Sequence, residues 1–202
     1  MPSPAFPLRA RINWPALIMT GLGLTLFGHG LYMGAKAQLA QALLSKTWAH
    51  TLKTGKFTPP WSSLDAYPIA KIGFPDQKKS AIVLSTDSGQ ALAFGPGLVN
   101  DAQSGGSLVI AAHKNTHFKP LKTLQPGNIV TLETVTNKTS YTVTDHAIID
   151  TRSDNLTLPA LQTHQTTQRP QNLVLVTCYP FDNISFNGPL RYVVYAKAVT
   201  SS

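Results

Sequence analysis

The sequence has only one cysteine, Cys178, in 202 residues. A single cysteine cannot close a disulfide within its own chain, so a disulfide-stabilised scaffold is excluded. Cys178 lies in the segment LVTCYPF, residues 175–181, where an apolar run typical of a β-strand ends at Tyr179-Pro180. Taken alone, this segment leaves two interpretations open: a small buried apolar side chain, or a reactive nucleophile at the end of a strand.

Acidic residues are absent from positions 1–60, which carry six basic residues. Residues 61–202 hold eleven basic and nine acidic residues, so most of the formal charge of +8 belongs to the N-terminal segment. No basic run with interleaved aromatic residues is present, which argues against nucleic-acid binding. Basic residues around an apolar stretch instead favour contact with a membrane surface.

Internal repeats, low-complexity tracts and Gly-rich phosphate-binding loops are also missing, and no strand–helix–strand rhythm is present. Short segments rich in β-branched and aromatic residues follow one another instead, separated by turn signals such as Gly95-Pro96-Gly97. These segments are residues 80–86, 107–113, 128–136, 140–150, 172–178 and 191–199. Their spacing predicts a mainly β domain, either a closed barrel or a sandwich.

One long apolar stretch, residues 14–33, carries no formal charge. About 20 apolar residues are enough to cross the hydrocarbon core of a bilayer. We therefore predict a transmembrane helix at residues 14–34, acting as a signal anchor, after a cytoplasmic N-terminus at residues 1–13. A cleaved signal peptide is the alternative, because small-x-small sites such as Ala35-Lys36-Ala37 follow the stretch.

The segment that follows, residues 35–65, predicts a juxtamembrane helix and a linker. Residues 35–54 are good helix formers with apolar positions at helical spacing. Gly55 is a plausible helix stop, and Pro59-Pro60 cannot continue a helix. The remaining residues, 66–202, are predicted to form the β domain.

Two of the predicted strands bring Cys178 close to an arginine. Residues 172–178 and 191–199 are consecutive and are joined by a 12-residue loop. If they pair as antiparallel neighbours, the end of the first lies beside the start of the second, so Cys178 and Arg191 share one edge of the sheet. A nearby guanidinium favours the thiolate form of a cysteine, and it can also donate hydrogen bonds to an oxyanion.

A cysteine nucleophile needs a proton carrier, and the six histidines differ in position. His113 ends the apolar segment SLVIAAH, so its side chain can emerge at a sheet edge as that of Cys178 does. The others are placed less well: His29 in the apolar stretch, His50 in the juxtamembrane helix, His146 within a strand and His164 in a polar loop. His117 follows His113 at a spacing that suits zinc only on a helix, so no metal site is predicted.

Several segments together resemble the sortases, a family of cysteine transpeptidases. LVTCYPF resembles the sortase signature Thr-Leu-x-Thr-Cys, and IAAHKNTHFKPLKTLQPGNIVTL resembles the histidine segment of the family. GPLRYVVYA resembles the last strand with its arginine, and ALAFGPGLV matches the stretch before the histidine. The resemblance covers about residues 66–200 in the family order His, Cys, Arg. Together with the N-terminal apolar helix, it is closest to the Gram-negative class GN, or marine proteobacterial, sortases.

The resemblance implies a closed sortase-type β-barrel of about eight strands with short helices. It implies three catalytic residues: Cys178 as the nucleophile, His113 as the general acid and base, and Arg191 as the group that stabilises an oxyanion or positions the substrate. Thr177, next to the nucleophile, is implied as a substrate-binding residue. Neither a cofactor nor a metal is implied.

The implied reaction is that of a hydrolase-class cysteine transpeptidase. It cleaves a C-terminal sorting signal of the Leu-Pro-x-Thr-Gly type on a partner protein, forms a thioester, and transfers the acyl group to an amine that the sequence does not identify. The lipid membrane is a further partner through the N-terminal helix, whereas nucleic acid is not. The expected location is the inner membrane, with a single span and the catalytic domain on the periplasmic side.

The sequence departs from the family pattern at four positions without losing a reacting group: Val174 for the first Thr of the signature, Ala112 for the Gly before the histidine, Lys114 for the frequent Arg after it, and Asn128 for the Asp of Pro-Gly-Asp. Two other interpretations stay open. One is a non-catalytic, membrane-anchored β-barrel that binds a surface protein. The other is an L,D-transpeptidase, whose Ser-x-Gly-Cys signature with an almost adjacent arginine is not found here.

Overall fold

A computed structural model describes most of the chain. The described residues are 13–99, 107–153, 171–182 and 188–199. The chain forms two compact units, Met1–Ala40 and Gln41–Ser202, and each is considered by itself.

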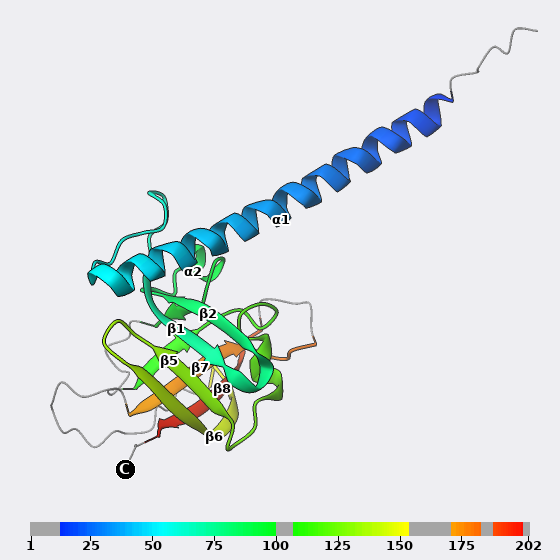
Figure 1. Ribbon diagram of the computed structural model, residues 1–202. Coiled ribbons are helices and arrows are strands. Elements are labelled where there is room, and N and C mark those ends of the chain that lie inside the picture. Colours follow the sequence, from blue (N-terminus) through cyan, green and yellow to red (C-terminus); the bar gives the residue numbers. More distant parts are fainter. Residues whose placement is uncertain (1–12, 100–106, 154–170, 183–187, 200–202) are drawn as a thin grey trace, which may run out of the picture. The chain divides into compact units, whose positions relative to one another are not determined.

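The apolar stretch lies within one uninterrupted helix, α1 (Trp14–Thr54), so the predicted transmembrane and juxtamembrane helices are continuous (Figure 1). The large apolar side chains between Trp14 and Met33 are all more than half exposed. A helix that is apolar all round is unsuited to the surface of a soluble domain. By length and composition α1 can cross a membrane, a test that a signal sequence near the N-terminus also passes. The predicted cytoplasmic segment lies outside the described residues except for Asn13.

Helix α1 ends where the sequence predicts a stop. Gly55 adopts a positive φ of 69°, and its amide donates a hydrogen bond to the carbonyl oxygen of Thr51 at 2.8 Å. Glycine adopts this left-handed conformation without steric cost. Within the second unit, Leu44 and Trp48 of α1 are buried in a cluster with Leu64 and Leu84. The last turns of the helix therefore belong to the core of the β domain.

The second unit is a closed β-barrel (Figure 1). Its eight strands are β1 (Pro68–Phe74), β2 (Lys79–Leu84), β3 (Gly97–Leu98), β4 (Leu108–Ala111), β5 (Ile129–Glu133), β6 (Lys138–Asp150), β7 (Asn172–Cys178) and β8 (Leu190–Ala198). Around the barrel the order is β1-β2-β3-β4-β7-β8-β6-β5, and the pairing of β5 with β1 closes it. The short helical elements are α2 (Gly89–Leu92), η1 (Pro75–Gln77) and η2 (Lys119–Thr123). The prediction of a closed barrel with short helices is confirmed.

Two strands, β1 and β3, have no counterpart among the segments predicted from the sequence. β1 contains Pro68 and Gly73, residue types that are unfavourable within strands. A tertiary contact explains the glycine at position 73, because a Cβ atom there would lie 2.5 Å from Oγ1 of Thr131 on β5. β3 is only two residues long, which is too short to show any periodicity.

Side chains on β7 and β8 alternate between the barrel interior and its outer face. Leu175 and Val194 belong to the main core inside the barrel. Val174 and Val193 belong to a separate buried cluster, together with Ile149 of β6. We call this second group, with Val109 of β4, the outer cluster. It forms an apolar surface on the outer face of four adjacent strands, β4, β7, β8 and β6.

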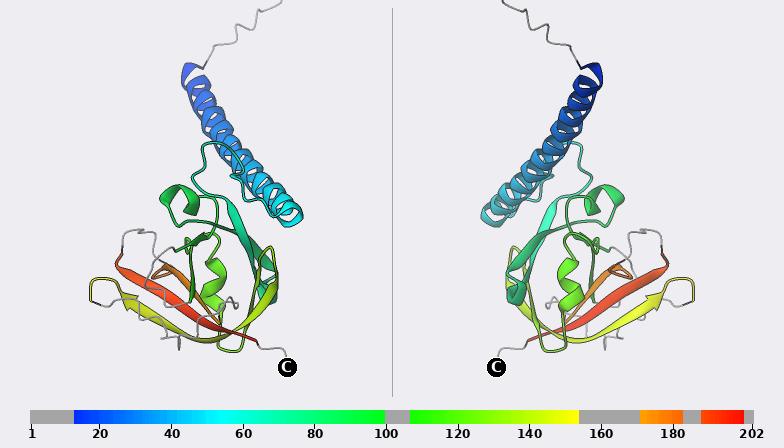
Figure 2. Two further views of the ribbon diagram at one scale, coloured as in Figure 1. Left: turned by 90° about the vertical axis from the view of Figure 1, so that its left-hand side faces the viewer. Right: turned by 90° about the vertical axis from the view of Figure 1, so that its right-hand side faces the viewer.

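A bulge in β6 brings Ile149 to the outer face. β6 and β8 lie side by side along most of their length (Figure 2), and their register shifts between Val143 and Asp145. Val143 still points into the core. After the shift, Ile149 lies opposite Arg191 and packs in the outer cluster. An extra residue in one strand reverses the facing of all residues beyond it, so the bulge completes the apolar surface beside Arg191.

Candidate active site

Cys178 and Arg191 are direct cross-strand partners in the antiparallel pair of β7 and β8. Opposite residues in such a pair point to the same face of the sheet. Both side chains are half-buried, and by alternation they share the outer face with Val176 and Val193. The predicted pairing of these strands is confirmed, and it brings the thiol and the guanidinium group to one edge of the sheet.

His113 reaches the same edge from the neighbouring strand. β4 runs parallel to β7, with Ala111 opposite Val176, and the amide of Ala112 donates to the carbonyl oxygen of Val176 at 3.2 Å. Two residues beyond this pair, the segment after β4 reaches His113 and β7 reaches Cys178. The two residues therefore lie side by side on the same face of the sheet. His113 is exposed. The three predicted residues thus come from adjacent strands in the order β4, β7, β8.

Thr177 supports this arrangement from the other face of the sheet. Its side chain is buried, and its hydroxyl donates a hydrogen bond to the carbonyl oxygen of Ala112 at 2.7 Å. The bond joins the residue before Cys178 to the residue before His113. Direct contact of Thr177 with a substrate stays a prediction, because the hydroxyl proton is already given to Ala112.

Lys114 makes a second connection between the two segments, which sequence reasoning missed. The residue is buried, and its Nζ donates to the carbonyl oxygen of Pro180 at 2.6 Å. Burying an ammonium group is costly unless it is hydrogen-bonded or paired. The only sequence signal was a lysine directly after an apolar strand, and lysine is almost never fully buried. Lys114 and Thr177 together fix His113 relative to Cys178.

The guanidinium group of Arg191 is held by backbone carbonyl groups at the start of β8 and just before it. Its Nη1 donates to the carbonyl oxygens of Gly188 at 2.7 Å and Leu190 at 3.0 Å. Leu190 also accepts a hydrogen bond from the amide of Tyr179, directly after the cysteine, at 3.0 Å. Among the described residues, no carboxylate forms an ion pair with Arg191. The cation is thereby oriented without being neutralised by the described part of the chain.

The segment that follows Cys178 contributes two rings to an aromatic cluster around Tyr192 of β8. Tyr179 stacks on Tyr192 with ring centroids 6.3 Å apart, and Phe181 meets Tyr192 edge-on at 5.1 Å. His146 of β6 also stacks on Tyr192, with ring centroids 5.6 Å apart. The pKa of Tyr192 is raised, first by burial and then by Tyr179. These contacts give His146 a packing role and give the segment after Cys178 a firm support.

The remaining histidines differ in their relation to the site. The backbone turns back after His113, because the amides of Thr116 and Phe118 both donate to its carbonyl oxygen, at 3.3 and 3.2 Å. His117 therefore lies close to His113, and its pKa is lowered by burial and then by His113, against a hydrogen bond to the backbone of Phe94. His29 and His50 lie on α1. His164 lies outside the described residues.

The residue pattern and fold match one protein family. A sequence model described as "Sortase domain" matches residues 72–199, well over half of the chain. The chain belongs to the sortase family. Sortase D of Bacillus subtilis (strain 168) is 30% identical to this sortase over 95 residues, which are 47% of this chain and 44% of that protein. The match thus spans less than half the length of this curated relative.

Solved sortase structures share the fold of the chain. A Clostridium perfringens Sortase D5 transpeptidase gives a TM-score of 0.56 at 18% identity, covering 79% of this chain and 99% of that chain. Sortase A from Corynebacterium diphtheriae gives 0.54 at 16% identity, covering 82% and 86%. Sortase E1 from Streptomyces coelicolor, solved with a tripeptide in the active site, gives 0.51 at 19% identity, covering 66% and 88%.

The departures of this sortase from the family pattern have local structural roles. Val174 is fully buried in the outer cluster, and Lys114 binds the carbonyl of Pro180. Asn128 accepts a hydrogen bond through its side-chain oxygen from the amide of Gln125 at 2.8 Å. An aspartate could accept the same bond, so Asn128 conserves the turn that leads into β5.

Proposed function

We propose that the chain is a membrane-anchored cysteine transpeptidase of the Gram-negative class GN. It cleaves a Leu-Pro-x-Thr-Gly-like C-terminal sorting signal on a partner protein and transfers the acyl group to an amine. The observation that carries the proposal is the register that sets Cys178 opposite Arg191, on the strand next to the one that leads to His113. The proposal is supported further by membership of the sortase family.

In the first half of the reaction, the Cys178 thiolate attacks the threonine carbonyl of the sorting signal. Arg191 donates hydrogen bonds to the tetrahedral oxyanion, a role that suits a cation already held by Gly188 and Leu190. His113, as the imidazolium, gives its proton to the departing glycine amine. The products are a thioester on Cys178 and the released C-terminal peptide.

In the second half, the nitrogen of an incoming amine attacks the thioester carbonyl. The neutral His113 accepts the proton that the amine loses, a C–N bond forms, and the C–S bond breaks. The thiolate of Cys178 and the imidazolium of His113 are restored. This pathway uses the side chains of the chain and the two substrates alone.

Membrane anchoring by α1 belongs to the same proposal. The helix has the length and composition of a membrane span, and basic residues flank its apolar stretch. We place the barrel on the periplasmic side of the inner membrane, as a single-pass protein whose helix is retained. A tethered enzyme meets tethered substrates at a high effective concentration. Retention is tested by the mass of the protein purified from membranes, because cleavage after Ala37 would remove the apolar part of α1.

The activity is tested by capturing the acyl-enzyme. The full chain in detergent micelles is mixed with a peptide that carries a Leu-Pro-x-Thr-Gly signal, and its intact mass is measured during turnover. We expect a mass increase equal to the acyl fragment up to threonine, followed by a peptide–amine product when an amine is added. Peptides in which the signal is scrambled provide the substrate control.

Cys178→Ala separates the proposal from its alternatives. We expect this variant to keep the fold, because the residue is half-buried at a strand end, and to form no acyl-enzyme. A non-catalytic binding module would form none even in the wild type and would not react selectively with a peptide vinyl sulfone at Cys178. Thioester formation in Cys178→Ala would refute the assignment of the nucleophile.

A further inference from the structure

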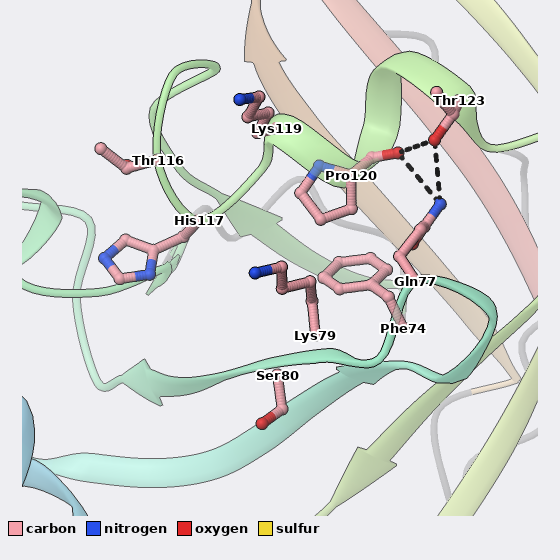
Figure 3. Close-up of a pocket in the computed structure, with 9 residues that line it drawn as sticks. All are labelled: Phe74, Gln77, Lys79, Ser80, Thr116, His117, Lys119, Pro120 and Thr123. Atoms are coloured by element: carbon pink, nitrogen blue, oxygen red, sulfur yellow. Dashed lines mark hydrogen bonds between the residues drawn. The ribbon is translucent and has the colours of Figure 1, made fainter.

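A hollow at the segment that follows His113 is lined by three basic side chains. It has a volume of about 460 Å³, and its lining includes Lys79 of β2, Lys119 of η2 and His117 (Figure 3). The uncharged polar residues Ser80, Thr116 and Thr123 also line it. We call this hollow the cationic pocket. In Figure 3 the ammonium groups of Lys79 and Lys119 both extend toward the side on which His117 lies.

The cationic pocket lies at the same end of the barrel as the candidate active site. β2 and β3 are parallel, and β3 is antiparallel to β4. The start of β2 at Lys79 therefore lies at the end of the barrel where β4 leads to His113. His117 links the two places directly, since it lines the pocket and is close enough to His113 for the charge on one ring to affect the other.

Strand order also defines where the cationic pocket lies relative to His113, Cys178 and Arg191. Along the barrel wall the order is β2, β3, β4, β7, β8. His113 follows β4, whereas Arg191 is on β8, so Cys178 separates the two. The oxyanion side of the site is the side of Arg191, and the cationic pocket lies on the opposite side, beyond His113. An amine that approaches from this side meets His113, the group that takes its proton, before it reaches Cys178.

The charges of the pocket are unbalanced. Among the described residues, no Asp or Glu lines it, and neither Lys79 nor Lys119 has a carboxylate partner, because the ion pairs in this part of the chain are Lys122–Asp182 and Arg152–Asp150. The positive charges of Lys79 and Lys119 repel each other, and an anion bound between them would be attracted to both. Ammonium groups are also donors from which phosphate and carboxylate oxygens accept hydrogen bonds.

We propose that the cationic pocket binds an anionic group, a phosphate or a carboxylate, that belongs to the amine acceptor. This inference rests on the proposed transpeptidase function and names the class of its second substrate. The anion is held between Lys79 and Lys119, and the amine of the same molecule extends past His113 to the thioester on Cys178. The amine nitrogen bonds to the acyl carbon, its proton passes to His113, and the thiolate leaves.

The test compares amines that differ only in the anionic group. One pair is 6-aminohexyl phosphate and 6-aminohexanol, and the second is 6-aminohexanoate and 6-aminohexanamide, whose long chains allow for the strands that separate β2 from β7. The full chain in detergent micelles is given a sorting-signal peptide, and the kcat/KM for each acceptor is measured from the peptide–amine product at constant salt. We expect the anionic member of at least one pair to be favoured about tenfold, as one charge-assisted hydrogen bond would give. The preferred pair identifies phosphate or carboxylate as the anion.

Two variants test whether the preference for anionic acceptors depends on the cationic pocket. In Lys79→Met/Lys119→Met the ratio between anionic and neutral acceptors should fall to within about twofold of one. Lys197→Met is the matched control, because Lys197 is an exposed lysine near the other end of β8, and it should keep the wild-type ratio. Equal use of both members of each pair by the wild type, or an unchanged ratio in the double variant, would overturn the proposal.

Direct binding keeps this inference separate from the proposed function. Inorganic phosphate is added to the full chain without peptide, and the histidine ring signals are followed by NMR. We expect the His117 signals to shift in the wild type at millimolar phosphate and to stay unshifted in Lys79→Met/Lys119→Met. Absence of an acyl-enzyme would refute the transpeptidase function, whereas absence of a phosphate effect together with absence of acceptor preference would refute the pocket alone.

Discussion

The hydroxyl of Thr177 donates a 2.7 Å hydrogen bond to the carbonyl oxygen of Ala112, and both residues are buried. Each of the two directly precedes a residue of the candidate site, Cys178 in one case and His113 in the other. The bond crosses from β7 to Ala112, the residue that follows the end of β4. The relative position of the thiol and the imidazole therefore depends on this contact together with the bond from Lys114 to the carbonyl oxygen of Pro180.

Thr177→Val should destabilise the barrel by about 1–3 kcal/mol, because it leaves a buried carbonyl oxygen without its donor while keeping the shape of the side chain. Thr177→Ser keeps the hydroxyl and should restore most of the acyl-enzyme formation that the valine variant loses. The measurements are thermal unfolding and the rate of acylation by a sorting-signal peptide. Equal acylation rates in the two variants would show that the hydroxyl has no positioning role.

Lys114→Met should slow acylation by up to about 100-fold, because a small displacement of catalytic groups is enough for such a loss. The variant removes the bond from Nζ to the carbonyl oxygen of Pro180 and frees the segment after Cys178. Lys114→Arg should recover part of the rate. The readout is kcat at saturating peptide, since a positioning defect lowers kcat more than it raises KM.

Lys122→Met is the matched control for Lys114. Lys122 also contacts the segment after the cysteine, through an ion pair with Asp182 at 2.5 Å, but both side chains are at least half exposed. Exposed ion pairs contribute about 0–1 kcal/mol, so acylation should change little. A larger loss in Lys122→Met than in Lys114→Met would contradict the role assigned to the buried lysine.

Arg191→Lys should lower acylation by about 100- to 1000-fold, as removal of an oxyanion donor does in other acyl-transfer sites. A lysine keeps the charge but cannot form the two Nη1 contacts to Gly188 and Leu190 and still present a second nitrogen to substrate. Reaction of Cys178 with a small alkylating reagent serves as the control for an intact, accessible thiol. Turnover close to that of the wild type would count against Arg191.

Gly97→Ala should destabilise the barrel by about 1–3 kcal/mol, the usual cost of overpacking. A Cβ atom at Gly97 would lie 2.3 Å from the carbonyl oxygen of Thr86 and 2.7 Å from the Cα of Asp87. Both are backbone atoms, which cannot rotate away. Gly89→Ala is the control, since nothing lies within 4 Å of a Cβ there. Thermal unfolding should show a lower midpoint for Gly97→Ala only.

Stability should fall as the pH falls below 6.5, in part because of His117. Burial and the neighbouring His113 lower the pKa of His117 from its ordinary value of 6.5. Between the lowered value and 6.5 the unfolded chain binds a proton that the folded chain does not, so acid favours unfolding in this window. His117→Gln should flatten the dependence of the unfolding midpoint on pH. An NMR titration with a His117 pKa above 6.5 would contradict this explanation.

Much of the barrel could be predicted from local patterns. The segments that became β2 and β4 to β8 are runs of β-branched and aromatic residues bounded by turn signals, which short-range sequence reading detects. β1 was not predicted because Gly73 weakens its strand pattern. A side chain at this position would meet Oγ1 of Thr131 on β5, a contact that the sequence alone does not reveal. The bulge in β6, which brings Ile149 beside Arg191, also left no local signal.

The chemical groups of the site can be read from local patterns: one thiol at a strand end, a histidine that ends another strand and an arginine that begins the next. An apolar segment long enough to cross a membrane can be read in the same way. The folded chain was needed to see that β4 and β7 are parallel neighbours, that Lys114 turns inward to Pro180, and that Lys79 and Lys119 share a hollow with His117. The physical reason is the range of the interactions. Strand propensity and turn chemistry act within a few residues, whereas pairing and burial join segments that are dozens of residues apart.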